Sequence, residues 1–510
     1  MRRFRALASP SLAVLALLLL IPVSASFLAV RTAHADNCSW SYDPSIGQPG
    51  ASGGGVLAFA DLEGDLVAGG TFRRMGGQSI PFVARWNGTQ WSPMGLGFSS
   101  SVNTLSWFHG SLHAFGQFLH AYPATAWRAA RWDGAAWQPL GVDQGLQRPS
   151  DIQWGTANVS LVRGDSVIVG GTFTRAGDQP VGLIAAWDGT AWHSLGAGFD
   201  SLTSDSGTCV FPPYPEVRAL AEYDGDLIAG GSFRLTAEGV TVHGIARWDG
   251  AVWQPLGAGM GTIAADCGPP MVHALAVWNG DLIAGGSFQT AGGTLAPRVA
   301  RWDGAAWHPM GSGWATQSGA VYELTVTPGG ELIAGGLAQQ PDPVPNKWQL
   351  ARWNGTDWEQ LGPGLTDAPA PQVYTLFRWG EDLAIGGAFT SDADGDTMNY
   401  VTLLRCNATT AVGDAAGSPA LALRVAGSNP FFGSVGLTFS IPADAADASL
   451  AIFDLAGRGV NRLSAGRTAA GEHRLEWNGR RDDGTRVPPG VYFARLRVGD
   501  EMASLRLVKL

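Results

Sequence analysis

Four cysteines, Cys38, Cys209, Cys267 and Cys406, are the residues of this chain with the most definite chemistry. Their spacing contains no Cys-x-x-Cys pair, which zinc sites and redox-active pairs commonly use. In an oxidising compartment, four such thiols favour two disulfide bonds over a metal centre. We therefore expect the four cysteines to form disulfides and to bind no metal.

Three aspartates near the end of a repeated region, Asp392, Asp394 and Asp396, alternate along the chain. Alternating carboxylates suit a hard cation such as calcium. In an EF-hand loop, however, glycine stands sixth and glutamate twelfth, whereas here Gly395 is fourth and Leu403 is twelfth. We interpret the segment as an acidic turn, and calcium binding stays an open alternative.

The chain has none of the short patterns that mark common catalytic sites. It contains no Gly-x-Ser-x-Gly, no His-Glu-x-x-His and no phosphate-cradling loop. Beyond the first 35 residues the histidines are scattered: His109, His113, His120, His193, His243, His273, His308 and His473. We predict no catalytic residue, no cofactor and no metal ligand, although a site assembled from distant segments would escape such a search.

Two further motifs have structural explanations. The tripeptide Arg163-Gly164-Asp165 spells a cell-adhesion sequence. It lies, however, in one copy of a repeat described below, at a position where the other copies have a turn such as Asp-Gly-Asp. Arg-Trp pairs such as Arg247-Trp248 recur at one strand position in most copies. Recurrence at one position indicates packing, with the arginine pairing an aspartate of a turn or stacking on tryptophan.

One segment recurs along the chain, and its clearest copy extends from Val217 to Gly257. Its Gly-Asp-Leu-Ile-Ala-Gly-Gly-Ser-Phe portion occurs in seven copies, roughly 45–60 residues apart. They begin at Gly64, Gly110, Gly164, Gly225, Gly280, Gly330 and Gly380. A period in this range is typical of propellers and solenoids.

Each copy predicts four strands, which in the clearest copy span residues 217–223, 226–233, 244–248 and 251–256. Asp224-Gly225 and Asp249-Gly250 predict tight two-residue turns, because both central positions of such turns need positive φ. The second strand is apolar on both faces, as expected for a strand between neighbouring sheets, and its paired glycines permit close backbone approach. Four strands per repeat indicate propeller blades.

The two ends of the repeat array complement each other. The last copy has a third strand, residues 400–406, but no fourth, and residues 38–42 form an orphan fourth strand before the first copy. Joining them completes a seventh blade.

Cys406 then stands before the missing turn and Cys38 directly after it, so we expect the two to face each other in a disulfide. Closing so long a loop stabilises a fold by about 3–5 kcal/mol. Cys209 and Cys267, in consecutive connections between blades, suggest a second disulfide.

The connections between strands differ sharply in length on one face of the predicted ring. Those that join the fourth strand to the next first strand, or the second to the third, are variable: residues 142–155, 199–215, 260–270, 339–347 and 391–400. Variable loops on a rigid scaffold commonly carry binding residues. We expect a ligand site on this face, and drift of the loops without function is the alternative.

The N-terminal 35 residues have the pattern of a signal peptide. Three early arginines precede an apolar run centred on residues 12–21, and Ala33-His34-Ala35 supplies a cleavage site. We expect a mature chain that begins at Asp36, is secreted or held at the outer cell surface, and has no membrane span. An uncleaved anchor is the alternative. The net charge of −10 argues against nucleic acid as a partner.

Residues 408–420 have the composition of a linker, and residues 421–510 predict a small β-sandwich. This last segment contains Asn429-Pro430-Phe431, residues 452–458 (Ile-Phe-Asp-Leu-Ala-Gly-Arg), Trp477-Asn478-Gly479 and residues 487–492 (Val-Pro-Pro-Gly-Val-Tyr) in order. It closely resembles the FlgD-like immunoglobulin-like domain and the related C-terminal sorting domain of type IX secretion. The resemblance implies export, surface attachment or release, with the type IX machinery as a partner. Asn478 departs from the usual aspartate at a turn position.

The repeat resembles the blades of fungal cortical-marker propellers and, more loosely, kelch blades. The predicted fold is therefore all-β: a seven-bladed β-propeller over residues 36–407, followed by an Ig-like β-sandwich. We expect a non-enzymatic propeller that binds a protein or glycan through its variable-loop face. The alternatives are a secreted hydrolase or lyase acting on polysaccharide and a structural surface-layer component. Carboxylates or histidines gathered at the central channel would favour the enzyme, and an aromatic face would favour binding.

Overall fold

The computed structural model describes residues 38–408 and 422–509 with gaps. The gaps are residues 142–144, 149–154, 201–214, 238, 263–269, 315–317, 328, 340–348, 363, 367–370, 381, 393, 427–433, 442–444, 455–457, 470, 483, 489 and 500. The predicted signal peptide and most of the linker lie outside the described residues. The described chain is all-β apart from one 3-10 turn, η1 (Pro44–Gly47). None of its helices is long and apolar enough to cross a membrane.

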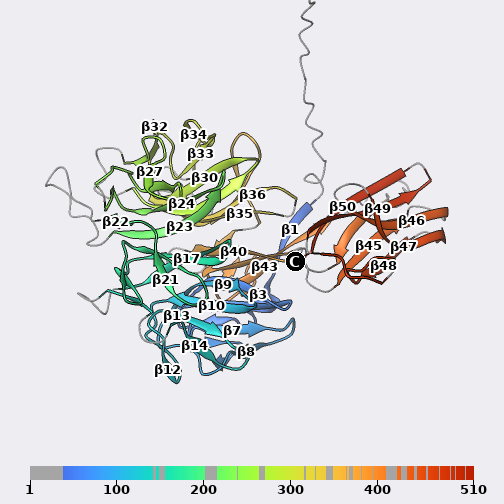
Figure 1. Ribbon diagram of the computed structural model, residues 1–510, viewed down its shortest axis with the longest axis horizontal. Helices are drawn as coiled ribbons and strands as arrows, with labels where there is room; N and C mark the ends of the chain where they lie inside the picture. The colour runs from blue at the N-terminus through green and yellow to red at the C-terminus, as the bar shows by residue number, and fades with distance from the viewer. Residues whose placement is uncertain are drawn as a thin grey trace, which may run out of the picture. The chain divides into compact units, whose positions relative to one another are not determined.

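Seven four-stranded antiparallel sheets make up most of the described part of residues 38–408 (Figure 1). Six take their strands in order from one repeat: β3 (Val56–Leu62), β4 (Asp65–Gly70), β7 (Val83–Trp86), β8 (Trp91–Pro93); β9 (Val102–Phe108), β10 (Ser111–Gly116), β13 (Ala129–Trp132), β14 (Trp137–Pro139); β16 (Ala157–Arg163), β17 (Ser166–Gly171), β20 (Ile184–Trp187), β21 (Trp192–Ser194); β23 (Glu216–Tyr223), β24 (Asp226–Ser232), β26 (Ile245–Trp248), β27 (Trp253–Pro255); β29 (Val272–Trp278), β30 (Asp281–Gly286), β33 (Val299–Trp302), β34 (Trp307–Pro309); β35 (Ser318–Val326), β36 (Leu332–Gln339), β37 (Leu350–Trp353), β38 (Trp358–Gln360).

Two-residue strands form small sheets between these larger ones. They are β2 (Ala51–Ser52), β5 (Arg74–Met75), β6 (Gln78–Ser79), β11 (His120–Ala121), β12 (Ala124–Thr125), β15 (Leu146–Gln147), β18 (Arg175–Ala176), β19 (Gln179–Pro180), β22 (Phe199–Asp200), β25 (Leu235–Thr236), β28 (Met260–Gly261), β31 (Thr290–Ala291), β32 (Thr294–Leu295), β39 (Leu365–Thr366) and β42 (Ser391–Asp392).

The seventh sheet joins the two ends of the array. Its strands are β1 (Cys38–Asp43), β43 (Val401–Ala408), β41 (Asp382–Ala388) and β40 (Gln372–Trp379), in that order. Figure 1 shows β1, in blue, beside β43, in orange. The predicted pairing of the orphan N-terminal strand with the last repeat is thus confirmed. The first strands of the seven sheets also contact one another in a closed cycle, from β3 through β9, β16, β23, β29, β35 and β40 back to β3.

The register of the seventh sheet corrects one premise of the predicted Cys38–Cys406 bond. Cys38 pairs with Ala408, and Cys406 pairs with Trp40. The two cysteines are therefore diagonal neighbours on adjacent strands and do not face each other directly. In the other six sheets the turn between third and fourth strands spans four residues, two more than predicted, and the seventh sheet has the same register without a turn.

The two kinds of turn within a repeat differ from each other. The turn at Asp224-Gly225 is the predicted two-residue turn, because Tyr223 pairs with Asp226 and the two central φ angles are 50° and 83°. The turn at Asp249-Gly250 spans four residues instead, since Trp248 pairs with Trp253. The Asp249 carboxylate accepts hydrogen bonds from the backbone N–H groups of Ala251 and Val252, both at 2.9 Å. This side-chain cap stabilises the wider turn and shortens the fourth strand.

The described C-terminal strands form two sheets, one of β44 (Ala422–Ala426), β45 (Val435–Ile441) and β48 (Gly471–Trp477) and one of β47 (Gly459–Thr468), β46 (Ala445–Asp454), β49 (Gly490–Val498) and β50 (Glu501–Lys509). Residues of both sheets, such as Leu437, Trp477, Leu450 and Leu507, belong to one buried apolar core.

Candidate functional site

A cavity of about 730 Å³ lies where the seven first strands meet. It is lined by the early residues of each first strand and by residues that follow the ends of second strands, such as Thr71, Gln117 and Thr172. First strands begin, and second strands end, at the variable connections. The cavity therefore lies at the variable-loop end of the strands, where the sequence predicts a ligand site.

A β-bulge in every first strand delivers one residue to this cavity. In β29, Val272 pairs with Gly286 and Ala274 pairs with Gly285, so His273 between them has no pairing partner on β30. The same register shift occurs in all seven sheets. The skipped residues are Leu57, Asn103, Asn158, Arg218, His273, Tyr322 and Tyr374, and all seven line the cavity. We call them the bulge ring. Bulges commonly re-aim a side chain toward a site.

The repeated glycine pair explains why the bulge forms at this place. A Cβ on the second glycine, Gly286, would lie 1.9 Å from the carbonyl oxygen of Met271, just before the bulge. A Cβ on the first glycine, Gly285, would lie 2.5 Å from Val321 Cγ1 on the neighbouring sheet. Only glycine leaves room for both approaches. The residue before each ring residue is therefore fixed by packing, and the ring residue itself is not.

The second sheet departs from this glycine pattern, and a change of residue on the neighbouring sheet compensates for the departure. Its first glycine position holds Phe115, and the neighbouring sheet has Ala157 where other copies have valine. Both residues are completely buried in one apolar cluster. A large residue on one strand is thus matched by a small one on the next, as close packing requires.

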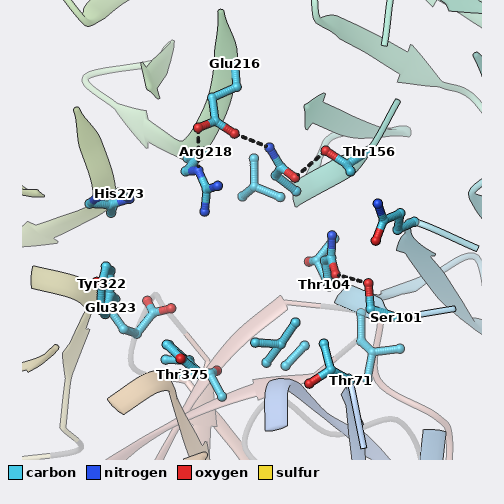
Figure 2. A pocket seen from close by; sticks show the side chains of 18 of the residues that line it. Thr71, Ser101, Thr104, Thr156, Glu216, Arg218, His273, Tyr322, Glu323 and Thr375 are labelled. Carbon is cyan, nitrogen blue, oxygen red and sulfur yellow. Dashed lines mark hydrogen bonds and ion pairs between the residues drawn. The ribbon is translucent and has the colours of Figure 1, made fainter. Parts of the chain in front are cut away.

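Hydrogen bonds hold the polar part of the bulge ring in place. Glu216 accepts a hydrogen bond from Asn158 Nδ2 at 3.0 Å and forms an ion pair with Arg218 Nε at 2.9 Å. The Asn158 amide oxygen accepts a hydrogen bond from Thr156 at 2.7 Å. Figure 2 shows this chain of contacts from Thr156 to Arg218 along one part of the cavity wall. Asn103 is held similarly, by the Ser101 hydroxyl at 2.8 Å. We call Asn103, Asn158 and Arg218 the polar arc.

Ring contacts hold the other part of the bulge ring. His273 meets Tyr322 edge-on with ring centroids 5.1 Å apart, and Tyr322 meets Tyr374 at 5.8 Å. These three residues, the aromatic arc, come from three consecutive sheets. Burial, with a smaller contribution from the charge of Arg218, lowers the pKa of His273 to about 3. The imidazole is therefore neutral at neutral pH.

Glu323 follows Tyr322 in the chain, and its residue type departs from the repeat. Other copies have a small or β-branched residue at its place, such as Ala58, Ala219 or Thr375. Its carboxyl is directed toward the cavity in Figure 2. Burial raises the pKa of Glu323 to about 8, against a smaller opposing effect of the hydrogen bond from the Leu324 N–H. Glu323 is thus largely protonated at neutral pH and can donate a hydrogen bond.

Several residues that the sequence analysis singled out have a local structural role. Asp392 is buried, and its carboxylate accepts hydrogen bonds from the N–H groups of Asp394 at 3.0 Å and Asp396 at 2.9 Å. This is the geometry of an acidic turn. Arg163 donates a hydrogen bond to the Gly225 carbonyl of the next sheet, which fits a role in packing. Among the described residues, no group of three His, Cys, Asp or Glu side chains could hold a metal ion.

The Arg-Trp pairs have the ion pairs expected of packing residues. Arg85 contacts Asp65 at 2.5 Å and Arg301 contacts Asp281 at 2.5 Å, in each case the first residue of the second strand. Of the eight scattered histidines, His273 is the one that the described cavity lining includes. Cys209 and Cys267, and most of the variable loops, lie outside the described residues.

The sequence analysis did not identify the bulge ring. One signal in the sequence could have revealed it: five residue types occupy the position after the repeated valine in the seven copies, while its neighbours recur. Such a position, exposed among fixed neighbours, is free to serve a ligand. Glu323 could have been found in the same way, as the one acid at a position otherwise occupied by alanine, threonine or valine.

Comparison with known proteins identifies the C-terminal segment. Residues 427–498 match the family described as the FlgD Ig-like domain, which confirms the predicted resemblance of this segment to that domain. A search of curated proteins found no match.

Solved structures give weaker similarities. PorZ, a surface component of the type-IX secretion system of Porphyromonas gingivalis, is 14% identical over 89% of this chain and 65% of its own, with a TM-score of 0.32. FlgD from P. aeruginosa is 25% identical over 14% of this chain and 58% of its own, with a TM-score of 0.13. A puromycin-hydrolyzing peptidase of Mycobacterium tuberculosis is 11% identical over 80% and 62%, with a TM-score of 0.40. The chain spans less than two thirds of each of these structures.

Proposed function

We propose that the seven four-stranded sheets are the blades of a β-propeller, and that this propeller binds a protein or glycan at its variable-loop face without catalysing a reaction. The closed cycle of contacts between the first strands supports the propeller. The observation that carries the binding role is the cavity of about 730 Å³ at the variable-loop end of these strands. Concave sites with a few convergent polar groups are the usual form of a ligand site.

The C-terminal domain gives the proposal its cellular setting. Residues 427–498 match the FlgD Ig-like family, and their motifs resemble those of type IX sorting domains. We propose that this domain serves secretion or surface attachment, with the type IX machinery as a partner, and that residues 1–35 are a signal peptide. The chain would then act outside the cell or on its surface. Cys38–Cys406 and Cys209–Cys267 disulfides suit that oxidising location.

Binding is tested by presenting the purified full chain to glycan arrays and peptide arrays, with product analysis of every hit. Binding of a glycan or peptide that is recovered intact would support the proposal. A chain that binds neither class would overturn it. Released sugars or cleaved peptides would show that the site is catalytic.

One observation favours the hydrolase or lyase as a second candidate. Glu216, His273 and Glu323 all line the cavity, and a protonated Glu323 could act as a general acid. Glu216, however, is already engaged by Arg218 and Asn158, which leaves it poorly placed to act as the second carboxylate. We therefore rank binding first. In the catalytic case, Glu323→Gln would abolish product formation while the substrate still binds.

A further inference from the structure

The residues of the bulge ring differ in type from copy to copy, whereas the buried residues that precede them are nearly constant. Each ring residue follows a completely buried residue, Val56, Val102, Ala157, Val217, Val272, Val321 or Val373. The ring residues themselves are all at least partly exposed to the cavity. Packing therefore determines the position of each ring side chain but not its chemical type. Five residue types occupy the seven positions, which gives the cavity an asymmetric lining on a repeated backbone.

This asymmetry divides the cavity wall into an aromatic part and a polar part. Around the cycle of strands, the three members of the aromatic arc are neighbours, and so are the three members of the polar arc. Figure 2 shows His273 and Tyr322 across the cavity from Ser101 and Thr104. One part of the wall thus presents aromatic rings and the part opposite presents hydroxyls and amides. A pyranose has the same division, since its C–H faces pack on aromatic rings and its hydroxyls form hydrogen bonds.

The charges of the cavity balance at neutral pH. Arg218 is paired with Glu216 at 2.9 Å, and His273 is neutral because its pKa is lowered to about 3. Glu323 is largely protonated because its pKa is raised to about 8. A cavity with no net charge gives no electrostatic gain to an acidic sugar, and the acidic chain as a whole repels anions.

We propose that the bulge ring is the specificity-determining surface of the cavity and that it takes an uncharged saccharide unit. The saccharide ring packs on the aromatic arc, and its hydroxyls meet the polar arc and the Glu323 carboxyl. This inference rests on the proposed binding function and names the ligand class of the same site.

The test compares two ring variants, His273→Ala and Tyr374→Ala, with a matched control. Val277→Ala changes an exposed residue on the same strand as His273, outside the cavity lining. The probes are neutral oligosaccharides, such as glucose, galactose and mannose oligomers, and their uronic acid counterparts, with Kd measured by calorimetry on the full chain. We expect each ring variant to bind the preferred neutral oligosaccharide about tenfold more weakly. Tyr374→Phe, which keeps the ring, and Val277→Ala should bind like the wild type.

The other outcomes separate the two proposals. If the wild type binds a neutral oligosaccharide and both ring variants bind it equally well, the ring is not the site, although the propeller still binds a glycan. A preference for uronic acid oligomers that Arg218→Gln abolishes would overturn the ligand class. Binding of peptides only would overturn the saccharide and leave the binding function in place. Circular dichroism and thermal unfolding establish that each variant is folded before its Kd is compared.

Discussion

Gly285 and Val321 belong to neighbouring sheets, and they approach so closely that a Cβ on Gly285 would lie 2.5 Å from Val321 Cγ1. The equivalent approach recurs between other sheets, as at Gly69 and Val102, where the distance would be 2.7 Å. This contact packs adjacent sheets together and fixes the residue before each bulge. It therefore links the glycine pair of the repeat to the position of the bulge ring.

Enlarging Gly285 should destabilise the protein in a way that a second change relieves. We expect Gly285→Ala to cost about 1–3 kcal/mol, because the added methyl group overpacks the contact with Val321. Val321→Ala alone should also destabilise by leaving a cavity. In the double variant the new methyl group occupies the vacated space, so the loss should be smaller than the sum by about 1 kcal/mol or more. Urea unfolding of the four proteins measures this coupling, and strict additivity would contradict the packing account.

The tryptophans of the fourth strands offer a test of the contacts between sheets. Trp307 Nε1 donates a buried hydrogen bond to the Leu256 carbonyl of the preceding sheet at 2.9 Å. Trp137 occupies the same place in its sheet, but its buried Nε1 has no hydrogen-bond partner in the described structure. Both substitutions to phenylalanine remove similar volume. Trp307→Phe should therefore cost about 1–3 kcal/mol more than Trp137→Phe, because it leaves the Leu256 carbonyl unsatisfied. Equal losses in thermal and urea unfolding would show that the hydrogen bond contributes nothing.

Glu323 should make the stability of the protein depend on pH. Its pKa is raised by burial from 4.5 to about 8, so between these values the folded chain holds a proton that the unfolded chain has lost. The free energy of unfolding should therefore decrease as the pH rises through this window. Glu323→Gln removes the titrating group, so the variant should match the wild type near pH ~4 and exceed it in stability above pH ~8.

Urea unfolding at several pH values measures this difference. Glu222→Gln, which removes a carboxylate at an exposed position late in β23, is the control for the change of charge. A difference between Glu323→Gln and the wild type that stays constant with pH would contradict the raised pKa.

The disulfide between Cys38 and Cys406 is a further prediction. The strands that carry the two cysteines are paired, and the residues are diagonal neighbours in the register. We expect peptide mapping of the protein isolated without reduction to recover the two as one linked fragment. Cys406→Ser should then lower the free energy of unfolding by about 3–5 kcal/mol under oxidising conditions and have little effect under reducing ones. Recovery of both as free thiols would refute the bond.

The amino-acid sequence by itself determined the repeat, the four strands of each copy and the joining of the two ends. The repeat and its strands are local features, because each copy contains its own turns and apolar strands within roughly 45–60 residues. The two-residue turn at Asp224-Gly225 was predicted for this reason. A two-residue turn was also predicted at Asp249-Gly250, and its length was wrong, because the aspartate side chain caps two backbone N–H groups and the turn spans four residues. The joining of the ends is not local, but it could be predicted because the last copy lacks the fourth strand that precedes the first copy.

Only the tertiary structure decided what the repeat builds at its centre. His273 and Tyr374 are ordinary strand residues in the sequence, and each belongs to a different sheet. They become members of one cavity wall because every first strand has a bulge at the same place and the strands meet in a closed cycle. The glycine pair that permits the bulge is visible in the sequence. The carbonyl oxygen that requires the second glycine comes close only when the first and second strands pair, and the valine that requires the first glycine comes close only when neighbouring sheets pack together.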